Sequence, residues 1–302
     1  MLALVIDAAL ACARATLVRV DGDGASALWQ GAPTDDPPGT PQRVVHRFIH
    51  APRGGGETAA EANVDTLLAA GVYEPRDTLA RLAALETSEE RWPALPRTLV
   101  FDTPFFRDLP AEARCYAIPQ DLAAELDLFR RGRHGPVHRL GARPGRCVSI
   151  VLAGETSVAA LVDGAPVEVS CGVSALEGVP GETTCGDIDP AGVLYLVDNL
   201  GLTPEEAERA LSLDGGLRGA ADPADPDSGP RLLIHRLRRY VGAYAALLDG
   251  LDALVIAGGD EPLAARLAAG LGYLGVGARV PVSHSPWTPA TAAAWVATQG
   301  RS

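Results

Sequence analysis

Short apolar runs separated by turn residues open the chain. Leu2 to Asp7 and Thr16 to Val20 are largely apolar, and Asp21-Gly22-Asp23-Gly24 then turns the chain toward a third run, Ala25 to Gln30. An Asp-Gly pair between apolar runs is a strong signal of a β-hairpin. Residues 1–30 are therefore predicted to form a three-stranded meander.

The same order of runs and turns returns in the middle of the chain. Val148 to Ala153 and Ser157 to Val162 are largely apolar, and Asp163-Gly164 leads into Ala165 to Ser170. Two segments with matched turn spacing, one opening each half, predict an internal duplication.

Helical periodicity and further short strands follow each meander. The predicted helices are Ala59 to Ala70, Arg76 to Leu85, Ala191 to Asp198, Thr203 to Ser212, Arg231 to Leu248 and Pro262 to Gly270, and the predicted strands are Thr98 to Asp102 and Leu251 to Ala257. Helices that alternate with strands behind a meander predict an α/β fold with mixed sheets.

Length and charge narrow the class of protein. A chain of 302 residues is longer than one core usually supports, so two domains are expected. The net charge of −12 argues against nucleic acid and against an anionic membrane as partners, because both need a positive face. The apolar runs are too short for a membrane span, and residues 1–20 lack the basic leader of a signal peptide. All 26 basic residues are Arg, so a phosphate-binding loop that relies on lysine cannot exist here.

The cysteines indicate a reducing compartment. They are Cys12, Cys115, Cys147, Cys171 and Cys185. Their number is odd and none is spaced as CxxC, which predicts free thiols, a cytoplasmic location and no zinc knuckle.

Two motifs carry a family resemblance. Phe101-Asp102-Thr103-Pro104-Phe105-Phe106 is similar to an "F-D-T-x-F" segment, and the stretch from Leu176-Glu177-Gly178 to Gly186-Asp187-Ile188-Asp189-Pro190 is similar to "L-E-G … G-D-I-D-P". Both segments are typical of the acetate kinase family, within the acetate and sugar kinase, Hsp70 and actin superfamily. The residues from Arg131 to His138 and from Tyr240 to Gly275 extend the resemblance in the same order.

The resemblance implies a fold and an activity. The expected fold is α/β, with two lobes of a duplicated ribonuclease H-like fold, residues 1–104 plus 287–302 forming one lobe and residues 105–286 the other. The implied reaction is transfer of a phosphoryl group from ATP, with Mg²⁺, to a short carboxylate such as acetate. A homodimer is the implied assembly.

Three residues are the catalytic candidates by this resemblance. In the family, the residue that matches Asp102 holds the phosphoryl group and metal. The residue that matches Arg47 neutralises the substrate's carboxylate or phosphate, and the residue that matches His134 stabilises the transferring phosphoryl group. A guanidinium suits both anions because it donates in a bidentate fork. The alternative for Asp102 is a structural role in a turn or a helix cap. The alternative for Arg47 is an ordinary surface arginine beside a buried strand. Gly135-Pro136 is expected to interrupt any helix at His134, and His138 is expected to be structural.

Other positions complete the implied site. Asp7, at the end of the first strand, is a second metal candidate. Gly154, Gly258 and Gly259 lie in segments that correspond to nucleotide-binding loops, and Arg218 aligns loosely with a turn that touches nucleotide. His134 and His138 have no third ligand in view for a zinc site.

The sequence also departs from the family where phosphate chemistry is done. The serines of the turn after the first strand are gone, Glu155 enters the second phosphate loop, and an essential family Arg is Thr184. The segment Ser283 to Trp287 has no carboxylate where the family has a metal-binding Glu. Two hypotheses remain open: a kinase of weak or altered activity, or a catalytically degenerate homologue that binds a nucleotide, a metabolite or a protein. Whether the chain is an enzyme is thus left open, and Arg53, Arg131 or Arg133 could replace the missing cation.

Overall fold

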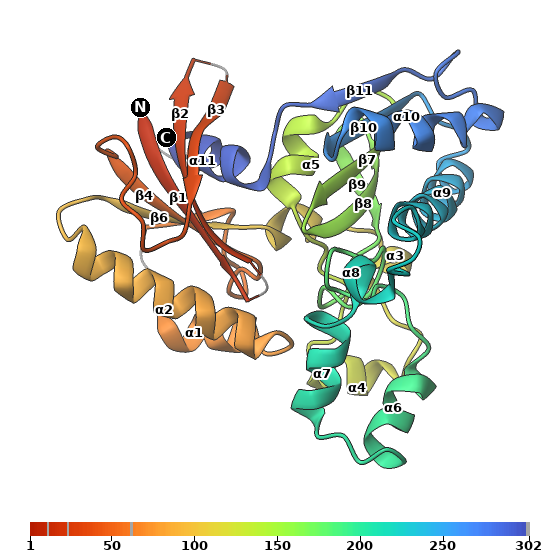
Figure 1. The fold of residues 1–302 in the computed structure, drawn as a ribbon, viewed down its shortest axis with the longest axis horizontal. Helices are drawn as coiled ribbons and strands as arrows, with labels where there is room; N and C mark the ends of the chain where they lie inside the picture. Colours follow the sequence, from red (N-terminus) through yellow and green to blue (C-terminus); the bar gives the residue numbers. More distant parts are fainter. Residues whose placement is uncertain (11, 23, 61–62, 300–302) are drawn as a thin grey trace. The chain divides into compact units, whose positions relative to one another are not determined.

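The computed structural model describes residues 1–10, 12–22, 24–60 and 63–299. The chain divides into two compact units (Figure 1). Unit 1 contains residues 1–107, 133–140 and 287–302, and unit 2 contains residues 108–132 and 141–286.

A mixed sheet forms the centre of unit 1. Its strands are β1 (Leu2–Ala9), β2 (Cys12–Asp21), β3 (Gly24–Gly31), β4 (Arg43–Phe48), β5 (Thr58–Ala59) and β6 (Arg97–Phe101), in the order β3-β2-β1-β4-β6-β5. β1, β2 and β3 are antiparallel neighbours and form the predicted meander. β4 and β6 then run parallel to β1, so the carboxyl ends of these three strands share one edge of the sheet.

Helices cover both faces of this sheet because its buried strands carry apolar side chains on both sides. α11 (Pro289–Gln299) covers one face, where Ala293 and Ala294 pack with Ala3 and Val5. α1 (Val64–Ala70) and α2 (Pro75–Arg91) cover the opposite face (Figure 1). A 3₁₀ turn, Thr103–Phe106, follows β6, and α5 (Gly135–Gly141) completes the unit.

Unit 2 is built on a second mixed sheet. Its strands are β7 (Arg146–Ala153), β8 (Glu155–Val162), β9 (Ala165–Val169), β10 (Ala253–Gly258) and β11 (Val282–Ser285), in the order β11-β10-β7-β8-β9. The remaining α-helices are α3 (Ala111–Arg114), α4 (Gln120–Glu125), α6 (Pro190–Asp198), α7 (Pro204–Ser212), α8 (Gly216–Ala220), α9 (Ser228–Leu247) and α10 (Glu261–Ala269). A short 3₁₀ helix, Gly272–Leu274, follows α10. Leu237 and Val241 of α9 join Leu267 of α10 in the core against this sheet.

The two sheets share one topology. In each, a meander of antiparallel strands supplies the first strand, and two later strands run parallel to it in the same spatial order. The predicted duplication and the α/β fold class with two mixed sheets are confirmed.

Some sequence-based expectations differ from the structure. The helix expected from Ala59 begins only at Val64, because Asn63 caps it by accepting a hydrogen bond from the Thr66 amide, and Thr58–Ala59 pair with β6 instead. Glu61 and Ala62 of that expected helix lie outside the described residues, as does Asp23 of the first turn. As expected, no helix runs through His134, whose φ is 59°. α5 starts at Gly135 instead, and proline fits the first turn of a helix because its missing N–H has no partner to lose there.

The division into units also differs from the predicted lobes. Residues 105–107 and 133–140 were assigned to the second lobe, and they belong to unit 1. For residues 133–140 the reason is local, since the His134 amide donates to Asp102 and Arg139 pairs with Glu57, both in unit 1.

Candidate functional site

Three predicted site residues lie where the parallel strands of unit 1 end. Asp7 is near the end of β1, Arg47 is near the end of β4, and Asp102 follows β6 directly. Because these strands are parallel neighbours, their carboxyl ends bring the three side chains to one place.

Arg47 links the two carboxylates. Its Nε donates to Oδ1 of Asp102 at 3.2 Å and its Nη2 to Oδ2 at 2.5 Å, while Nη1 donates to Oδ2 of Asp7 at 2.6 Å. Arg47 is 5% exposed and Asp102 is 2% exposed. Arg47 is therefore not a surface residue, and Asp102 holds it in a bidentate fork whose direction is fixed.

His134 joins this group through its backbone. Its amide donates to Oδ2 of Asp102 at 2.9 Å, and its φ of 59° is in the left-handed region. The next residue must be glycine, because a Cβ on Gly135 would lie 2.1 Å from the Asp102 carbonyl oxygen. Arg47, Asp102 and His134 are thus brought together within one unit. His138 lies on α5, fully buried, with its ring edge-on to Phe106.

Burial, and after it the positive charge of Arg47, lowers the pKa of the His134 imidazole well below its usual value. The ring is neutral near pH 7 as a result. A neutral imidazole carries one N–H donor and one acceptor.

Sequence reasoning missed a second buried arginine, Arg81 of α2. Its Nη1 donates to Oδ1 of Asp7 and to the Arg47 carbonyl oxygen, both at 2.7 Å, and its Nε donates to Oδ2 of Asp77 at 2.6 Å. Arg81 is 2% exposed. The only signal was Asp77 four residues before Arg81, a spacing that is usual on a solvated helix face.

The arginines set the charge state of Asp7. Burial alone would raise the pKa of the Asp7 carboxyl, but Arg47 and Arg81 outweigh it and hold that pKa well below its usual range. Asp77 is tied to the same region, since its Oδ1 accepts from the Leu10 amide at 2.9 Å, in the turn after β1.

The glycines predicted to bind nucleotide lie at one edge of the sheet in unit 2. β7 and β10 are parallel with Leu152 opposite Gly258, so Gly154 after β7 and Gly259 after β10 are at the same strand ends. The φ angles of Gly154, Gly258 and Gly259 are 77°, 76° and 70°. A Cβ on Gly258 would lie 2.1 Å from the Leu152 carbonyl oxygen, so the two strand ends approach closely only without a side chain there.

Arg218 is connected to Gly154 through Glu182. The Gly154 carbonyl accepts from the Glu182 amide at 2.5 Å, and the Glu182 carbonyl accepts from the Arg218 amide at 2.9 Å. The Arg218 guanidinium also pairs with the Glu182 side chain. Unit 2 therefore gathers its four predicted nucleotide-binding residues around one set of loops.

Comparison with known proteins identifies the lineage. The model of the Acetokinase family matches residues 44–268. An acetate kinase from Nitratidesulfovibrio vulgaris (strain DP4) is 34% identical in an alignment of 269 positions that covers 77% of this chain and 66% of that protein. An acetate kinase from Leifsonia xyli subsp. xyli is 34% identical over 90% of this chain and 74% of its own length. The chain belongs to the acetokinase family.

Solved structures of acetokinase relatives share the fold. Acetate kinase from Porphyromonas gingivalis superimposes with a TM-score of 0.77 at 19% identity, over 99% of both chains. Propionate kinase from Francisella tularensis subsp. tularensis SCHU S4 gives a TM-score of 0.80 at 18% identity, again over 99% of both chains.

The carboxylates of this acetokinase-family chain do not fit a metal ion in their present arrangement. Both oxygens of Asp7 and both oxygens of Asp102 accept hydrogen bonds from arginine side chains. The positively charged guanidinium groups that donate these bonds would repel a cation placed on the same oxygens. Among the residues that the structure describes, no group of three or more His, Cys, Asp or Glu side chains could hold a metal ion.

The loop with Thr184 is closed by its own hydrogen bonds. The Thr184 hydroxyl accepts from the Gly181 amide at 3.1 Å, and the residue is 6% exposed. Two of the arginines considered as replacements for the family cation have carboxylate partners elsewhere, Arg131 with Asp127 and Arg133 with Glu74, each at 2.9 Å. Arg218, paired with Glu182, is bound to the Thr184 loop itself.

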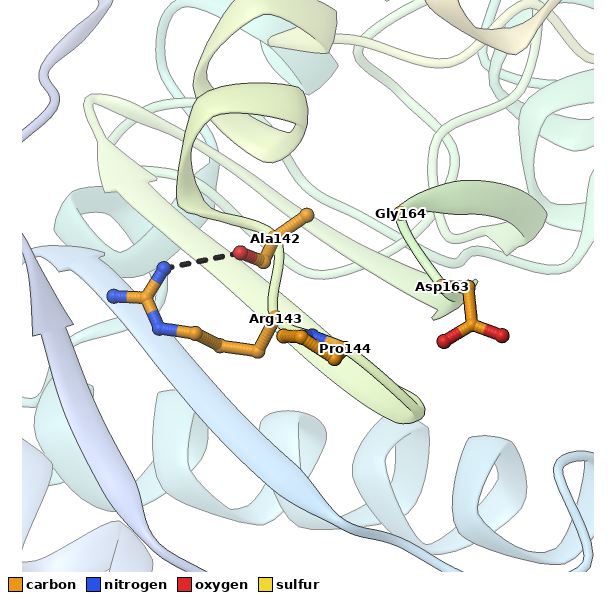
Figure 2. A pocket seen from close by; sticks show the side chains of 5 residues that line it. All are labelled: Ala142, Arg143, Pro144, Asp163 and Gly164. Atoms are coloured by element: carbon orange, nitrogen blue, oxygen red, sulfur yellow. Dashed lines mark hydrogen bonds between the residues drawn. The ribbon is translucent and has the colours of Figure 1, made fainter.

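A pocket of about 380 Å³ lies elsewhere in unit 2 (Figure 2). Its lining residues are Ala142, Arg143, Pro144, Asp163 and Gly164. None of them is a predicted site residue, and Arg143 turns back to donate to the Ala142 carbonyl at 3.0 Å. Within the described ranges, no helix has the length and apolar character to cross a membrane.

Proposed function

We propose that the chain is an acetate kinase-like phosphotransferase that uses ATP to phosphorylate a short carboxylate, with reduced or altered turnover. The reaction would convert acetate and ATP to acetyl phosphate and ADP. The observation that carries this proposal is the Arg47 guanidinium, held in a fork by Asp102 next to His134, in a chain of the acetokinase family.

The chemistry of these groups supports the proposal. Phosphoryl transfer is catalysed mainly by positioning and by stabilising charge on the transferred group. Arg47 would offer fixed positive charge to the carboxylate or phosphoryl oxygens, and Asp102 would keep it oriented. His134 would donate one hydrogen bond from a neutral ring, and its backbone amide is held by the Asp102 carboxylate.

ATP would bind at the strand ends of unit 2, through Gly154, Gly258, Gly259 and Arg218. Mg²⁺ is the metal that the family implies, and it would neutralise charge on the ATP phosphates. Asp7 and Asp102 remain our candidates for contacting it, although each would first have to release an arginine. We therefore assign no step of the reaction to a metal held by these residues.

The alternative function is that of a catalytically degenerate homologue that binds a nucleotide, metabolite or protein. One observation favours it: the anion-binding parts of the site are satisfied internally. The Leu10 amide, in the turn where the family binds phosphate, donates to the Asp77 carboxylate. A carboxylate in that position opposes phosphate binding.

Calorimetric titration with Mg·ATP, followed by an acetyl phosphate assay in the same sample, separates the two functions. Binding with turnover supports the kinase. Binding without turnover supports the degenerate homologue, and no binding would contradict an ATP-dependent reaction.

Two variants sharpen this test. Arg47→Lys keeps the charge but loses the fork, so kcat should fall by about 10²-fold or more if the fork aligns the transferred group. Arg139→Lys is the matched control, because Arg139 pairs with Glu57 in the same unit at 41% exposure and should leave kcat unchanged. Equal activity of the two variants would contradict the role given to Arg47.

The family resemblance also leads us to propose a homodimer in a reducing, cytoplasmic compartment. Cys115, Cys147, Cys171 and Cys185 are free thiols, which agrees with such a compartment. Sedimentation velocity at several protein concentrations would give a species of twice the chain mass if the dimer forms, and a concentration-independent monomer would contradict it.

A further inference from the structure

Arg81 is not among the residues proposed to act on substrate, yet it contacts both Asp7 and the backbone of Arg47. One nitrogen, Nη1, donates both to the side chain of Asp7 on β1 and to the backbone carbonyl of Arg47 on β4. These strands are hydrogen-bonded neighbours, so Arg81 joins a side chain and a backbone group across the strand pair that carries the site.

The charge balance explains why this second arginine matters. Asp7, Asp77 and Asp102 are three buried or largely buried carboxylates that share Arg47 and Arg81. Arg81 occupies Oδ1 of Asp7, which leaves only Oδ2 for Arg47. Arg47 can then direct its Nε and Nη2 edge at Asp102. Without Arg81, Asp7 would rely on Arg47 alone, and the two carboxylates would compete for one guanidinium.

We propose that Arg81 is a positioning residue for the phosphotransferase site: it fixes Asp7 and the β4 backbone so that the Arg47 guanidinium stays aligned with Asp102. This inference rests on the proposed function for its effect on turnover, but its geometric part does not. Asp77 extends the same support, because it orients Arg81 through Nε and also accepts from the Leu10 amide in the turn after β1.

A lysine cannot do the same work. Arg81 uses Nε for Asp77 and Nη1 for Asp7 and the Arg47 carbonyl, which are separate points of a planar group. A lysine ammonium is a single point charge and cannot span them. Arg81→Lys therefore keeps the buried positive charge but cannot make all three hydrogen bonds of Arg81 at once.

The test compares Arg81→Lys with Arg91→Lys, a control on the same helix whose arginine pairs with the exposed Asp36. The first readout is the hydrogen exchange of the Arg47 Nε–H, followed by NMR in arginine-labelled protein and assigned with Arg47→Lys. Loss of the support should speed this exchange about 10-fold or more in Arg81→Lys, as expected when a buried group opens more often. The control should exchange like the wild type.

The second readout is steady-state kinetics with ATP and acetate. We expect kcat to fall at least about 10-fold in Arg81→Lys, since small misplacements of a positioned group are costly. The KM for ATP should stay within about twofold, because nucleotide is assigned to residues of unit 2. A general loss of folding would change both constants and the exchange of many amides.

The outcomes separate this inference from the proposed function. Unchanged Arg47 exchange in Arg81→Lys overturns the inference whether or not the enzyme is active, and faster exchange with unchanged kcat overturns the catalytic part. If the wild type has no turnover but the Arg47 Nε–H exchanges faster in Arg81→Lys, the proposed function fails while the positioning of Arg47 by Arg81 is supported. If Arg81→Lys does not fold, the variant Asp77→Asn/Arg81→Gln, which removes one charge of each sign, gives the same readouts.

Discussion

At the scale of single residues, Gly135 determines how closely α5 can approach the end of β6. Its missing side chain lets its backbone lie against the Asp102 carbonyl, and this contact sets where the His134 amide meets the Asp102 carboxylate. The position of His134 thus depends on Gly135, a residue without a functional side chain.

We predict that Gly135→Ala destabilises unit 1 by about 1–3 kcal/mol, the usual cost of forcing a methyl group into packed surroundings. Denaturant unfolding followed by circular dichroism, which reports on the helices of both units, measures it. The control is Gly192→Ala in α6, where the added Cβ meets nothing within 4 Å. That change should be neutral or stabilising by up to about 1 kcal/mol, because alanine is the better helix former. Equal effects of the two changes would contradict the close approach at Gly135.

The sequence supports the residue-level site unevenly. Asp102, Arg47 and His134 were proposed through the family resemblance, and Asp7 through its place at the end of the first predicted strand. Arg81 was not found, because an arginine in a helix pattern is normally solvated and only its partners on β1 and β4 reveal its burial. Contacts of this kind join residues far apart in the chain, and no local spacing encodes them.

At the scale of elements, the end of β10 and the start of α10 depend on two glycines in left-handed conformation. Gly258 also passes within contact distance of the Leu152 carbonyl on β7, whereas Gly154 has open space around its Cα. A side chain at Gly154 would therefore meet only the strain of a left-handed backbone, whereas a side chain at Gly258 would meet that strain and a steric clash. Comparing the two positions separates the two costs.

Gly154→Ala should cost only the left-handed strain of about 1–2 kcal/mol. Gly258→Ala should add a clash worth about 1–3 kcal/mol more and push β7 and β10 apart. Thermal unfolding by circular dichroism gives the stabilities, and calorimetry with Mg·ATP gives the affinities. We expect a greater loss of nucleotide affinity for Gly258→Ala, and the reverse order would contradict the assigned loop.

Elements with strong turn signals were predicted well, whereas the start of α1 was not. The Asp-Gly turns located both meanders, because left-handed or tight turns restrict which residues can occupy them. The start of α1 was placed too early because apolar periodicity continues before Val64, and only the Asn63 cap shows where the helix begins. Gly135-Pro136 was expected to keep His134 out of a helix, and the pair does so by forming the first turn of α5.

At the scale of the whole molecule, the buried histidines, His46, His50, His134 and His138, all lie in unit 1. Burial lowers the pKa of His46 to about 3 and that of His138 to about 3. Burial would raise the pKa of the Glu74 carboxyl, but Arg133 and His50 outweigh it and hold that pKa below its usual range. Acid should therefore act on unit 1 before it acts on unit 2.

We predict that the free energy of unfolding of unit 1 falls as the pH drops below about 6.5. A histidine with a lowered pKa in the folded state binds its proton only on unfolding, so its contribution is present above pH 6.5 and is lost toward pH 3. Each such histidine contributes a slope of up to about 1.4 kcal/mol per pH unit in that window. Asp7 and Glu74 add to the loss only below about pH 4, where their unfolded carboxyls protonate.

Tryptophan fluorescence isolates this effect, because Trp29, Trp92, Trp287 and Trp295 all belong to unit 1. His46→Gln should reduce the slope, since glutamine can still bond to Ser88 but takes up no proton. His235→Gln, at an exposed position on α9, is the control and should leave the slope unchanged. A stability that is flat between pH 7 and pH 5 would contradict the burial of these histidines.

The placement of α11 has a consequence for synthesis on the ribosome. Ala293, Ala294 and Val296 complete the core on one face of the first sheet, yet they are translated after every residue of unit 2. The nascent chain can bury the second sheet while the first still lacks one of its covering helices. Unit 1 is therefore completed only after unit 2 has been synthesised, and until then one apolar face of its sheet stays uncovered.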